Sequence, residues 1–315
     1  DVCSSDLSGL MAMNATLLGG LSTSALQGLT TAQAVALTSS SLQALSASQI
    51  NALTSTALQA IETADTATLS KGQIGSISST QLNQLSTGQI RALTDTQLKA
   101  LSTSQVVGLS STQLGALSST QLRTLSTQQV QSLNLANLGT VQTANLSSTQ
   151  LQSLTTTQMG TVNSNLLSLG TAGFNALGSS QMATISTTAF GTLSSTLING
   201  LNSSAIRAIS AAQINALSSS SLALVSSSNI ASLTSSQVSG LSSAQINLLS
   251  STQISGLTSS NIQSLTSAQV TGLSTTTIAS LSSSQLQALT TAQLQSVTLS
   301  RLGRSEEHTS ELQSH

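Results

Sequence analysis

Large apolar residues recur every eight positions along most of the chain, and a second apolar residue follows five positions after each of them. We number the positions of one repeat from zero to seven, so that the apolar positions are zero and five. The consensus is L-[ST]-[ST]-x-Q-[LIV]-x-[AGST]. In one stretch position zero is held by Leu69, Ile77, Leu85, Leu93, Leu101, Leu109, Leu117, Leu125 and Leu133. Position five of the same repeats is held by Ile74, Leu82, Ile90, Leu98, Val106, Leu114, Leu122, Val130 and Leu138. A fixed short period of this kind predicts a repeat architecture.

The phase of this repeat is kept over long stretches and slips twice. It holds from about Met13 to Val141 and later runs on to Val297, which gives about 37 repeats. It slips once at Leu146, which ends one repeat and begins the next, and once near Leu169. The pattern is most degenerate between about residues 133 and 206. We therefore expect one array whose middle part is the least regular.

A period of eight excludes the two simplest backbones. In a continuous α-helix each residue turns about 100°, so the apolar stripe would drift by about 80° per repeat and wind around every face. In a flat strand positions zero and five have opposite parity and would point to opposite faces. Only a bent β-solenoid, which absorbs the mismatch at its corners, remains as a strand-based alternative.

Short capped helices fit the period better. In the repeat that starts at Leu101, an N-cap at Ser102 makes Gln105 the third helical residue, which is the S/T-x-x-Q capping box. Leu101 and Val106 then occupy the two positions of a hydrophobic staple. The same pairing is predicted for Ser118 with Gln121, Thr94 with Gln97, Ser242 with Gln245 and Thr290 with Gln293, and Glu62 with Asp65 is a charged variant. So short a helix needs neighbours. The predicted fold is therefore an all-α solenoid with one short capped helix per repeat, and a β-solenoid is the alternative.

Charged residues avoid the predicted core. Arg91, Lys99, Arg123 and Arg207 occupy position six, so this position is expected to face water. Positions zero and five carry no charge in the array. They are therefore the predicted buried line, and position five also holds the two aromatic residues, Phe174 and Phe190.

Both ends of the chain depart from the repeat. The tail, residues 304–315, resembles a translated DNA-sequencing adapter, and the head, residues 1–7, resembles the reverse complement of the same adapter. Such segments are excluded from fold reasoning. The array is then residues 8–303, Ser8 to Gly303. It lacks Cys3, His308 and His315, and has three acidic and six basic residues, a formal charge of +3.

The composition offers little for chemistry. Charged residues make up 5% of the chain, against about 25% in a typical domain. Inside the array no histidine is present to activate a serine, and Lys71 is expected to be a solvated lysine at a polar position rather than the base of a Ser/Lys pair. Glu62, Asp65 and Asp95 are too few for a calcium site. Gly170 and Gly173 lack the Lys-Ser/Thr that completes a phosphate-binding loop. We expect no enzyme, with no catalytic, cofactor-binding or metal site and no cofactor.

Macromolecular partners leave equally weak signals. Arg91, Lys99 and Arg123 share position six and could line one ridge, but three cations are too few for nucleic-acid binding. No apolar run reaches the roughly 20 residues of a membrane span. Three glycosylation sequons begin at Asn14, Asn145 and Asn202, as chance allows in a Ser/Thr-rich chain. Partners stay unknown and are expected to be proteins or cell surfaces.

The array resembles the Ser/Thr/Gln-rich repeat regions of large bacterial adhesin-like surface proteins over Ser8 to Gly303. The resemblance implies an extracellular or cell-surface location and a structural spacer or stalk function. Two alternatives stay open. One is a partner-binding solenoid whose variable position-six residues, such as Asn51, Arg91, Lys99 and Gln287, set specificity. The other is a Thr/Ser-ladder β-solenoid of the ice-binding kind.

Overall fold

The computed structural model describes residues 15–162 and 167–296, and within these ranges the backbone forms short helices and no strand. The predicted all-α repeat fold is therefore confirmed, and the β-solenoid alternative is wrong for the described residues. The adapter-like ends, Asn14, Val297 and Arg301 lie outside these ranges.

The chain divides into two compact segments, segment 1 (Asp1–Ser168) and segment 2 (Leu169–His315). The division falls inside the stretch that the sequence marks as most degenerate. The helices of segment 1 are α2 (Ala15–Gly19), α3 (Thr23–Gln27), α4 (Thr31–Val35), α5 (Ser39–Ala44), α6 (Ala47–Ala52), α7 (Ser55–Ala60), α8 (Thr63–Thr66), α9 (Lys71–Ser76), α10 (Ser79–Gln84), α11 (Thr87–Ala92), α12 (Asp95–Ala100), α13 (Thr103–Val107), α14 (Ser111–Ala116), α15 (Ser119–Thr124), α16 (Thr127–Ser132), the 3₁₀ helix η1 (Leu135–Asn137), α17 (Thr140–Ala144), α18 (Ser148–Ser153) and α19 (Thr156–Val162).

Segment 2 continues with helices of the same kind. They are α20 (Gly170–Ala176), α21 (Ser179–Ala183), α22 (Thr187–Gly191), α23 (Ser195–Asn199), α24 (Ser203–Ala208), α25 (Ala211–Asn215), α26 (Ser219–Ala223), α27 (Ser227–Ala231), α28 (Ser235–Ser239), α29 (Ser243–Asn247), α30 (Ser251–Gly256), α31 (Ser259–Gln263), α32 (Ser267–Thr271), α33 (Thr275–Ala279) and α34 (Ser283–Gln287).

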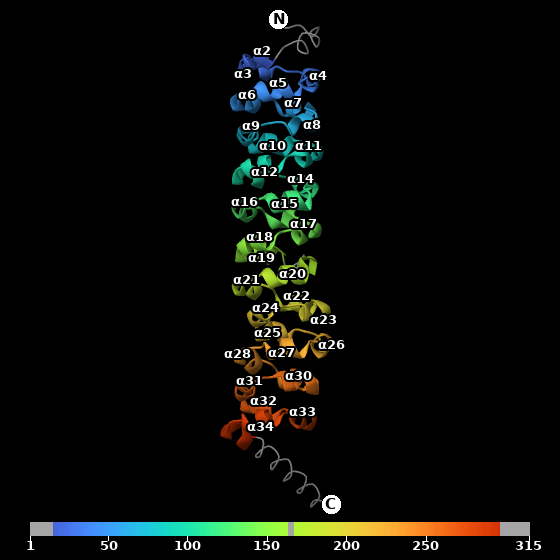
Figure 1. The fold of residues 1–315 in the computed structure, drawn as a ribbon, viewed down its shortest axis with the longest axis vertical. Coiled ribbons are helices and arrows are strands. Elements are labelled where there is room, and N and C mark those ends of the chain that lie inside the picture. Colours follow the sequence, from blue (N-terminus) through green and yellow to red (C-terminus); the bar gives the residue numbers. More distant parts are fainter. Residues whose placement is uncertain (1–14, 163–166, 297–315) are drawn as a thin grey trace, which may run out of the picture. The chain divides into compact units, whose positions relative to one another are not determined.

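Most helices pack on the helix three repeats further along the chain, as α6 does on α9 and α27 on α30. Three repeats, or 24 residues, therefore make one coil of the solenoid. Within each segment successive coils lie on one another in chain order, as the colours in Figure 1 show. We call a column of helices that are three repeats apart a stack, so that each segment has three stacks.

The backbone turns between consecutive helices, as the junction of α12 and α13 shows. Leu101 ends α12 with φ −63° and ψ 133°, and Ser102 begins α13 with φ −69° and ψ 160°. Both conformations lie in the broad extended region that any L-residue adopts. The sharp change of direction after every helix therefore needs no special residue, which is why one octapeptide can repeat so often.

Positions zero and five form the core as predicted. Leu98 and Val106 are fully buried at position five, and Leu101 and Leu109 are nearly so at position zero. Phe174 and other large position-five residues are enclosed in the same way in segment 2. No helix among the described residues is long and apolar enough to cross a membrane.

The first phase slip lies earlier than the sequence pattern suggests. Leu133 begins a repeat of only five residues, whose helix is reduced to η1, and Leu138 begins the next repeat. Leu138 is thus a position-zero residue, not a position-five residue, and Val141, expected in the core at position zero, is 65% exposed. Asn134 explains the short repeat, because its side chain accepts a hydrogen bond from the Ala136 N–H and favours a tight turn over a helix.

The second slip has a different backbone cause. Gly170, directly after Leu169, has φ +57° and opens α20. It is the one residue with positive φ in the described part of the chain. Only glycine adopts this left-handed conformation without a steric penalty.

Candidate functional site

The glutamine at position four closes its own helix N-terminus. In α13 the Ser102 Oγ accepts a hydrogen bond from the Gln105 N–H at 3.2 Å, and the Gln105 Oε1 accepts from the Ser102 N–H at 2.8 Å. These are the two bonds of a capping box. These bonds use the oxygen of the Gln105 side-chain amide. The two N–H groups of its nitrogen still need acceptors.

The same amide also binds the preceding coil. The Gln105 Nε2 donates to the Ile74 carbonyl at 3.0 Å and to the Ile77 carbonyl at 2.6 Å, and Gln105 is only 3% exposed. These two carbonyls end α9 and lead into α10, the helix on which α13 packs. Every polar atom of this buried side chain therefore has a partner, so its burial carries no unpaired group.

We call this arrangement the glutamine clamp: a position-four Gln whose Nε2 donates to two carbonyls of the preceding coil. It recurs in both segments. The clamps are Gln49, Gln73, Gln81, Gln89, Gln97, Gln105, Gln113, Gln121, Gln129, Gln150, Gln158, Gln213, Gln237, Gln253, Gln269, Gln285 and Gln293. A glutamate would cap the helix equally well but has no N–H to donate. Stacking of coils is what requires the amide.

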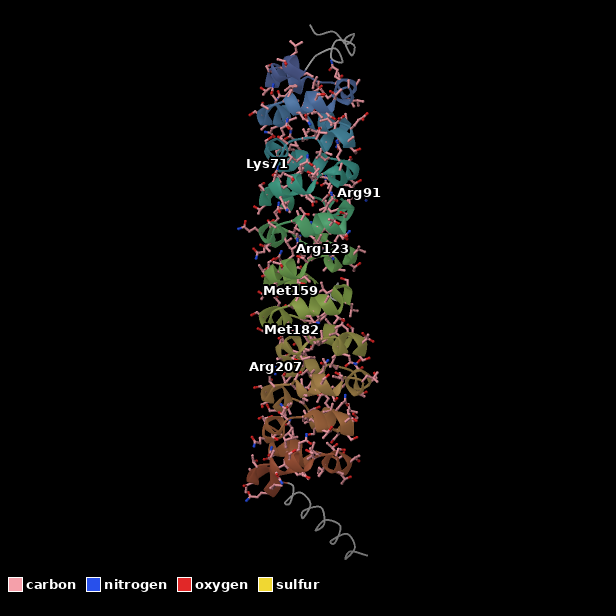
Figure 2. The ribbon with its side chains drawn as sticks, in the orientation of Figure 1. Lys71, Arg91, Arg123, Met159, Met182 and Arg207 are labelled. Carbon is pink, nitrogen blue, oxygen red and sulfur yellow. The ribbon has the colours of Figure 1, made fainter. Side chains whose placement is uncertain are left out.

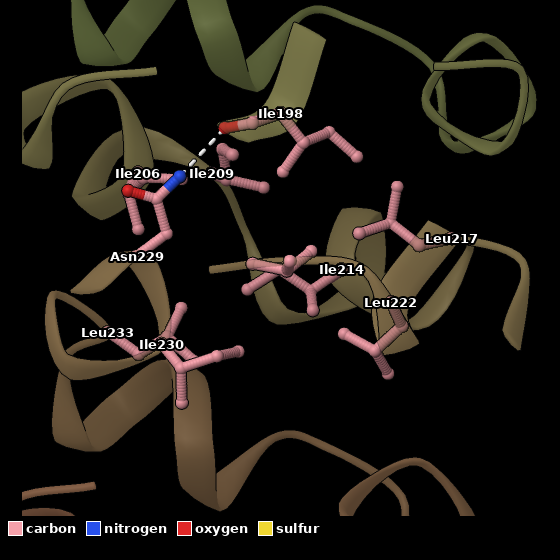
Figure 3. A pocket seen from close by; sticks show the side chains of 10 residues that line it. Ile198, Ile206, Ile209, Ile214, Leu217, Leu222, Asn229, Ile230 and Leu233 are labelled. Atoms are coloured by element: carbon pink, nitrogen blue, oxygen red, sulfur yellow. Dashed lines mark hydrogen bonds between the residues drawn. The ribbon is translucent and has the colours of Figure 1, made fainter. Parts of the chain in front are cut away.

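Shorter side chains at position four make incomplete clamps. Asn229 donates only to the Ile198 carbonyl, at 2.8 Å, and Asn261 donates only to the Leu233 carbonyl, at 3.0 Å. Beside Asn229 lies a cavity of about 30 Å³ (Figure 3). Its walls are otherwise aliphatic side chains, among them Ile206, Ile214 and Leu222. The missing methylene of Asn229 accounts for both the lost bond and part of this space.

Position-six asparagines compensate where position four has no glutamine. The Asn199 Nδ2 donates to the Leu224 carbonyl at 2.8 Å, and its Oδ1 accepts from the Ser226 N–H at 2.7 Å. Ser226 is the N-cap of the helix that contains Asn229. Its N–H is therefore satisfied from the preceding coil.

The same substitution occurs at two other sites. Asn175 accepts from the N–H of Asn202, whose repeat has Ala205 at position four. Asn247 accepts from the N–H of Ser274, whose repeat has Thr277 there. Sequence reasoning missed this group. The sequence signal for this group is an asparagine at position six, four repeats before a repeat without glutamine at position four.

One predicted capping box is replaced in the same way. The Ser242 N–H donates to the Asn215 Oδ1 at 3.2 Å, and Gln245 instead accepts from the Ser242 Oγ. The predicted reciprocal box of Ser242 with Gln245 is therefore half formed, because the preceding coil supplies the acceptor.

The predicted charged cap is also wrong. Glu62 is the N-cap of α8 but makes no side-chain cap hydrogen bond. The carboxylate of Asp65 accepts a hydrogen bond from the Ser39 hydroxyl, one coil earlier. Asp65 therefore joins two coils where a capping partner was expected. Asp95 lies exposed at the start of α12.

The position-six arginines bind backbone rather than forming a basic ridge. The Nε of Arg91 donates to the Ala116 carbonyl at 3.2 Å, that of Arg123 to the Asn145 carbonyl at 2.9 Å, and that of Arg207 to the Ser232 carbonyl at 3.4 Å. Each of these carbonyls lies at or next to a helix C-terminus, where a cation is favoured. All three side chains remain exposed.

The three cations proposed for one ridge belong to two stacks. Lys99 on α12 and Arg123 on α15 lie in one stack, whereas Arg91 on α11 lies in another. Lys71, on α9 in the stack of Lys99, and Arg91 lie toward opposite sides in Figure 2. The prediction of a single ridge is therefore wrong. Among the variable position-six residues, Asn51 and Arg91 make bonds between coils, and Lys99 and Gln287 are exposed.

The remaining candidates serve the fold. Gly173 is buried inside α20, away from any loop that could hold a phosphate. Asn145 and Asn202 use their side chains in hydrogen bonds to Val141 and Ala205. The described residues contain no group of three or more His, Cys, Asp and Glu side chains placed to share a metal ion.

Comparison with known proteins agrees with the repeat. A model of the ALTTAQ repeat matches three overlapping stretches, residues 58–95, 87–119 and 95–127. The letters ALTTAQ themselves occur at residues 288–293. No curated protein and no solved structure matches the chain. The chain is therefore a tandem-repeat structural array, similar to ALTTAQ repeats over residues 58–127.

Proposed function

We propose that the array is a non-enzymatic spacer or stalk within a larger secreted or cell-surface protein of the adhesin-like kind. The observation that carries this proposal is the glutamine clamp. Each complete clamp fixes a repeat to the coil before it through two hydrogen bonds, and in most clamps the glutamine is buried. Stacked coils of this kind define a distance, which is what a spacer must supply.

The composition of the outer surface supports the same proposal. Positions one to three are mostly Ser and Thr, and the three position-six arginines donate to backbone carbonyls. Such a surface is wettable but carries little charge for attracting ligands by long-range electrostatics. The surface location rests on the resemblance to adhesin-like repeat regions.

A distance measurement tests the spacer function. Spin labels are placed on two exposed residues of segment 1, Lys71 and Thr149, each changed to Cys in a Cys3→Ser background. Deleting residues 109–132 removes one whole coil and keeps the phase of the repeat. Because packed helix axes lie about 8–10 Å apart, the label distance should fall by about that amount.

One further deletion provides the control. Deleting 24 residues outside the labelled interval, residues 29–52, should leave the distance unchanged. If the distance distribution is broad, or if it does not respond to the deletion of 109–132, the array is not a spacer. Protease treatment of intact cells that make the natural protein tests its location. A cell-surface array should be cleaved, whereas an intracellular array would be protected by the membrane.

A further inference from the structure

The contacts that hold the coils together are local in sequence. The bonds of the glutamine clamps join residues 25 to 31 positions apart. The bonds that position-six side chains make between coils join residues 22 to 30 positions apart. The helices that pack most closely are those three repeats apart. Opening one coil therefore breaks contacts with adjacent coils only.

Tension applied along the chain acts on the contacts between coils one coil at a time. In segment 1 the helices follow one another along the stack in chain order (Figure 1). The coil that carries Gln97, Gln105 and Gln113 is held to the coil before it by at least two hydrogen bonds from each glutamine. Tension along the chain is thus resisted at an end coil by the clamps of that coil, not by all clamps in parallel.

Closure of an opened coil meets no slow chemical step. The chain has no proline, so prolyl isomerisation does not delay refolding. Its contacts are short in sequence separation, which is the condition for fast folding. The capping bonds of each helix span three residues and re-form within the repeat itself.

We propose that the array is an elastic tether that opens and closes coil by coil under tension. The inference rests on the proposed spacer function and adds to it a limit on the force that the spacer transmits. It assigns a mechanical role to the clamps, which set the force at which each coil opens.

Single-molecule stretching of the full chain between its termini tests this proposal. One coil has 24 residues, so its opening should lengthen the chain by about 75 Å, which is the extended length minus the packed height. We expect steps of this size, recovered on relaxation. Release of segment 1 in one event of about 450 Å, or no recovery on relaxation, would overturn the proposal.

A pair of variants tests the role of the clamp. Gln105→Glu removes both donors to the preceding coil, so the opening rate of one coil at constant force should rise at least about tenfold. Gln27→Glu makes the same chemical change at an exposed position six and should alter no step. A uniform shift of all steps in Gln105→Glu would contradict coil-by-coil opening.

The outcomes separate this proposal from the spacer function. If the label distances follow the coil deletions but the chain opens in one event, the spacer stands and elasticity fails. If Gln105→Glu does not fold, the step size and recovery of the unaltered chain decide the question by themselves.

Discussion

Residues 87–119 in segment 1 and residues 198–233 in segment 2 follow the same repeat but stabilise it differently. In the first region Gln89, Gln97, Gln105 and Gln113 are all clamps, and each is at most 3% exposed. In the second region three of the four repeats carry another residue at position four, namely Ala205, Ser221 and Asn229.

The second region shows which part of the clamp can be replaced. The Asn199 and Asn175 side chains supply the acceptor that a capping glutamine would offer. In the three repeats without glutamine, the position-four side chain does not donate to two carbonyls of the preceding coil, and a cavity of about 30 Å³ remains beside Asn229. A side chain from the preceding coil can therefore replace the capping acceptor of the glutamine. It does not replace the two N–H donors of the glutamine or the volume that its side chain fills.

The largest expected effect is a core truncation in the regular region. Ile90→Ala should lower the free energy of unfolding by about 3–5 kcal/mol, because Ile90 is fully buried among well-packed neighbours. Ile214→Ala, at the same position but beside the cavity, should cost about 1 kcal/mol less, since fewer contacts are lost. Denaturant unfolding measures both. Equal costs would mean that the cavity does not weaken the packing of the second region.

A glutamate at a clamp should have the next largest effect. In Gln105→Glu a carboxylate faces two carbonyl oxygens without an N–H, so we expect a loss of about 3 kcal/mol. Amide hydrogen exchange should speed up most around Ile74 and Ile77, because their carbonyls lose the Gln105 donor. The exposed Gln27→Glu should change stability by less than about 0.5 kcal/mol. Tolerance of Gln105→Glu would show that stacking does not depend on the two donors.

Removing a compensating asparagine should cost less. Asn199→Ala deprives the Ser226 N–H of its acceptor and should lower stability by about 1–2 kcal/mol. The matched variant is Asn215→Ala, whose partner Ser242 keeps Gln245 at position four as a second acceptor. Its cost should therefore be smaller. The reverse order in thermal or denaturant unfolding would contradict the compensation.

Restoring the consensus should give the smallest change, and a gain. Asn229→Gln adds a methylene beside the cavity and a second donor toward the Leu201 carbonyl, so stability should rise by about 0.5–1.5 kcal/mol. Asn261→Gln adds the same group away from that cavity and should gain less. A loss in Asn229→Gln would show that Asn199 and a glutamine compete for the Ser226 N–H.

The sequence predicted the repeat, the short helices and the buried positions, because these depend on contacts within eight residues. Leu101, Ser102 and Gln105 carry their own capping signal wherever the repeat occurs. The sequence pattern places the first slip at Leu146 rather than at Leu133, because Leu138 suits either apolar position. Only packing excludes Val141 from the core. The prediction that Arg91, Lys99 and Arg123 line one ridge is wrong, because the sequence does not show which helices share a stack.

By itself the sequence determined that most octapeptides form a capped helix with two buried apolar residues, since period and capping chemistry are local. Only the tertiary structure decided that three repeats make a coil and that the Gln105 side-chain amide donates to the Ile74 and Ile77 carbonyls. The partners of those hydrogens lie 28 and 31 residues away. No local pattern specifies them, because the number of repeats per coil follows from how whole helices pack.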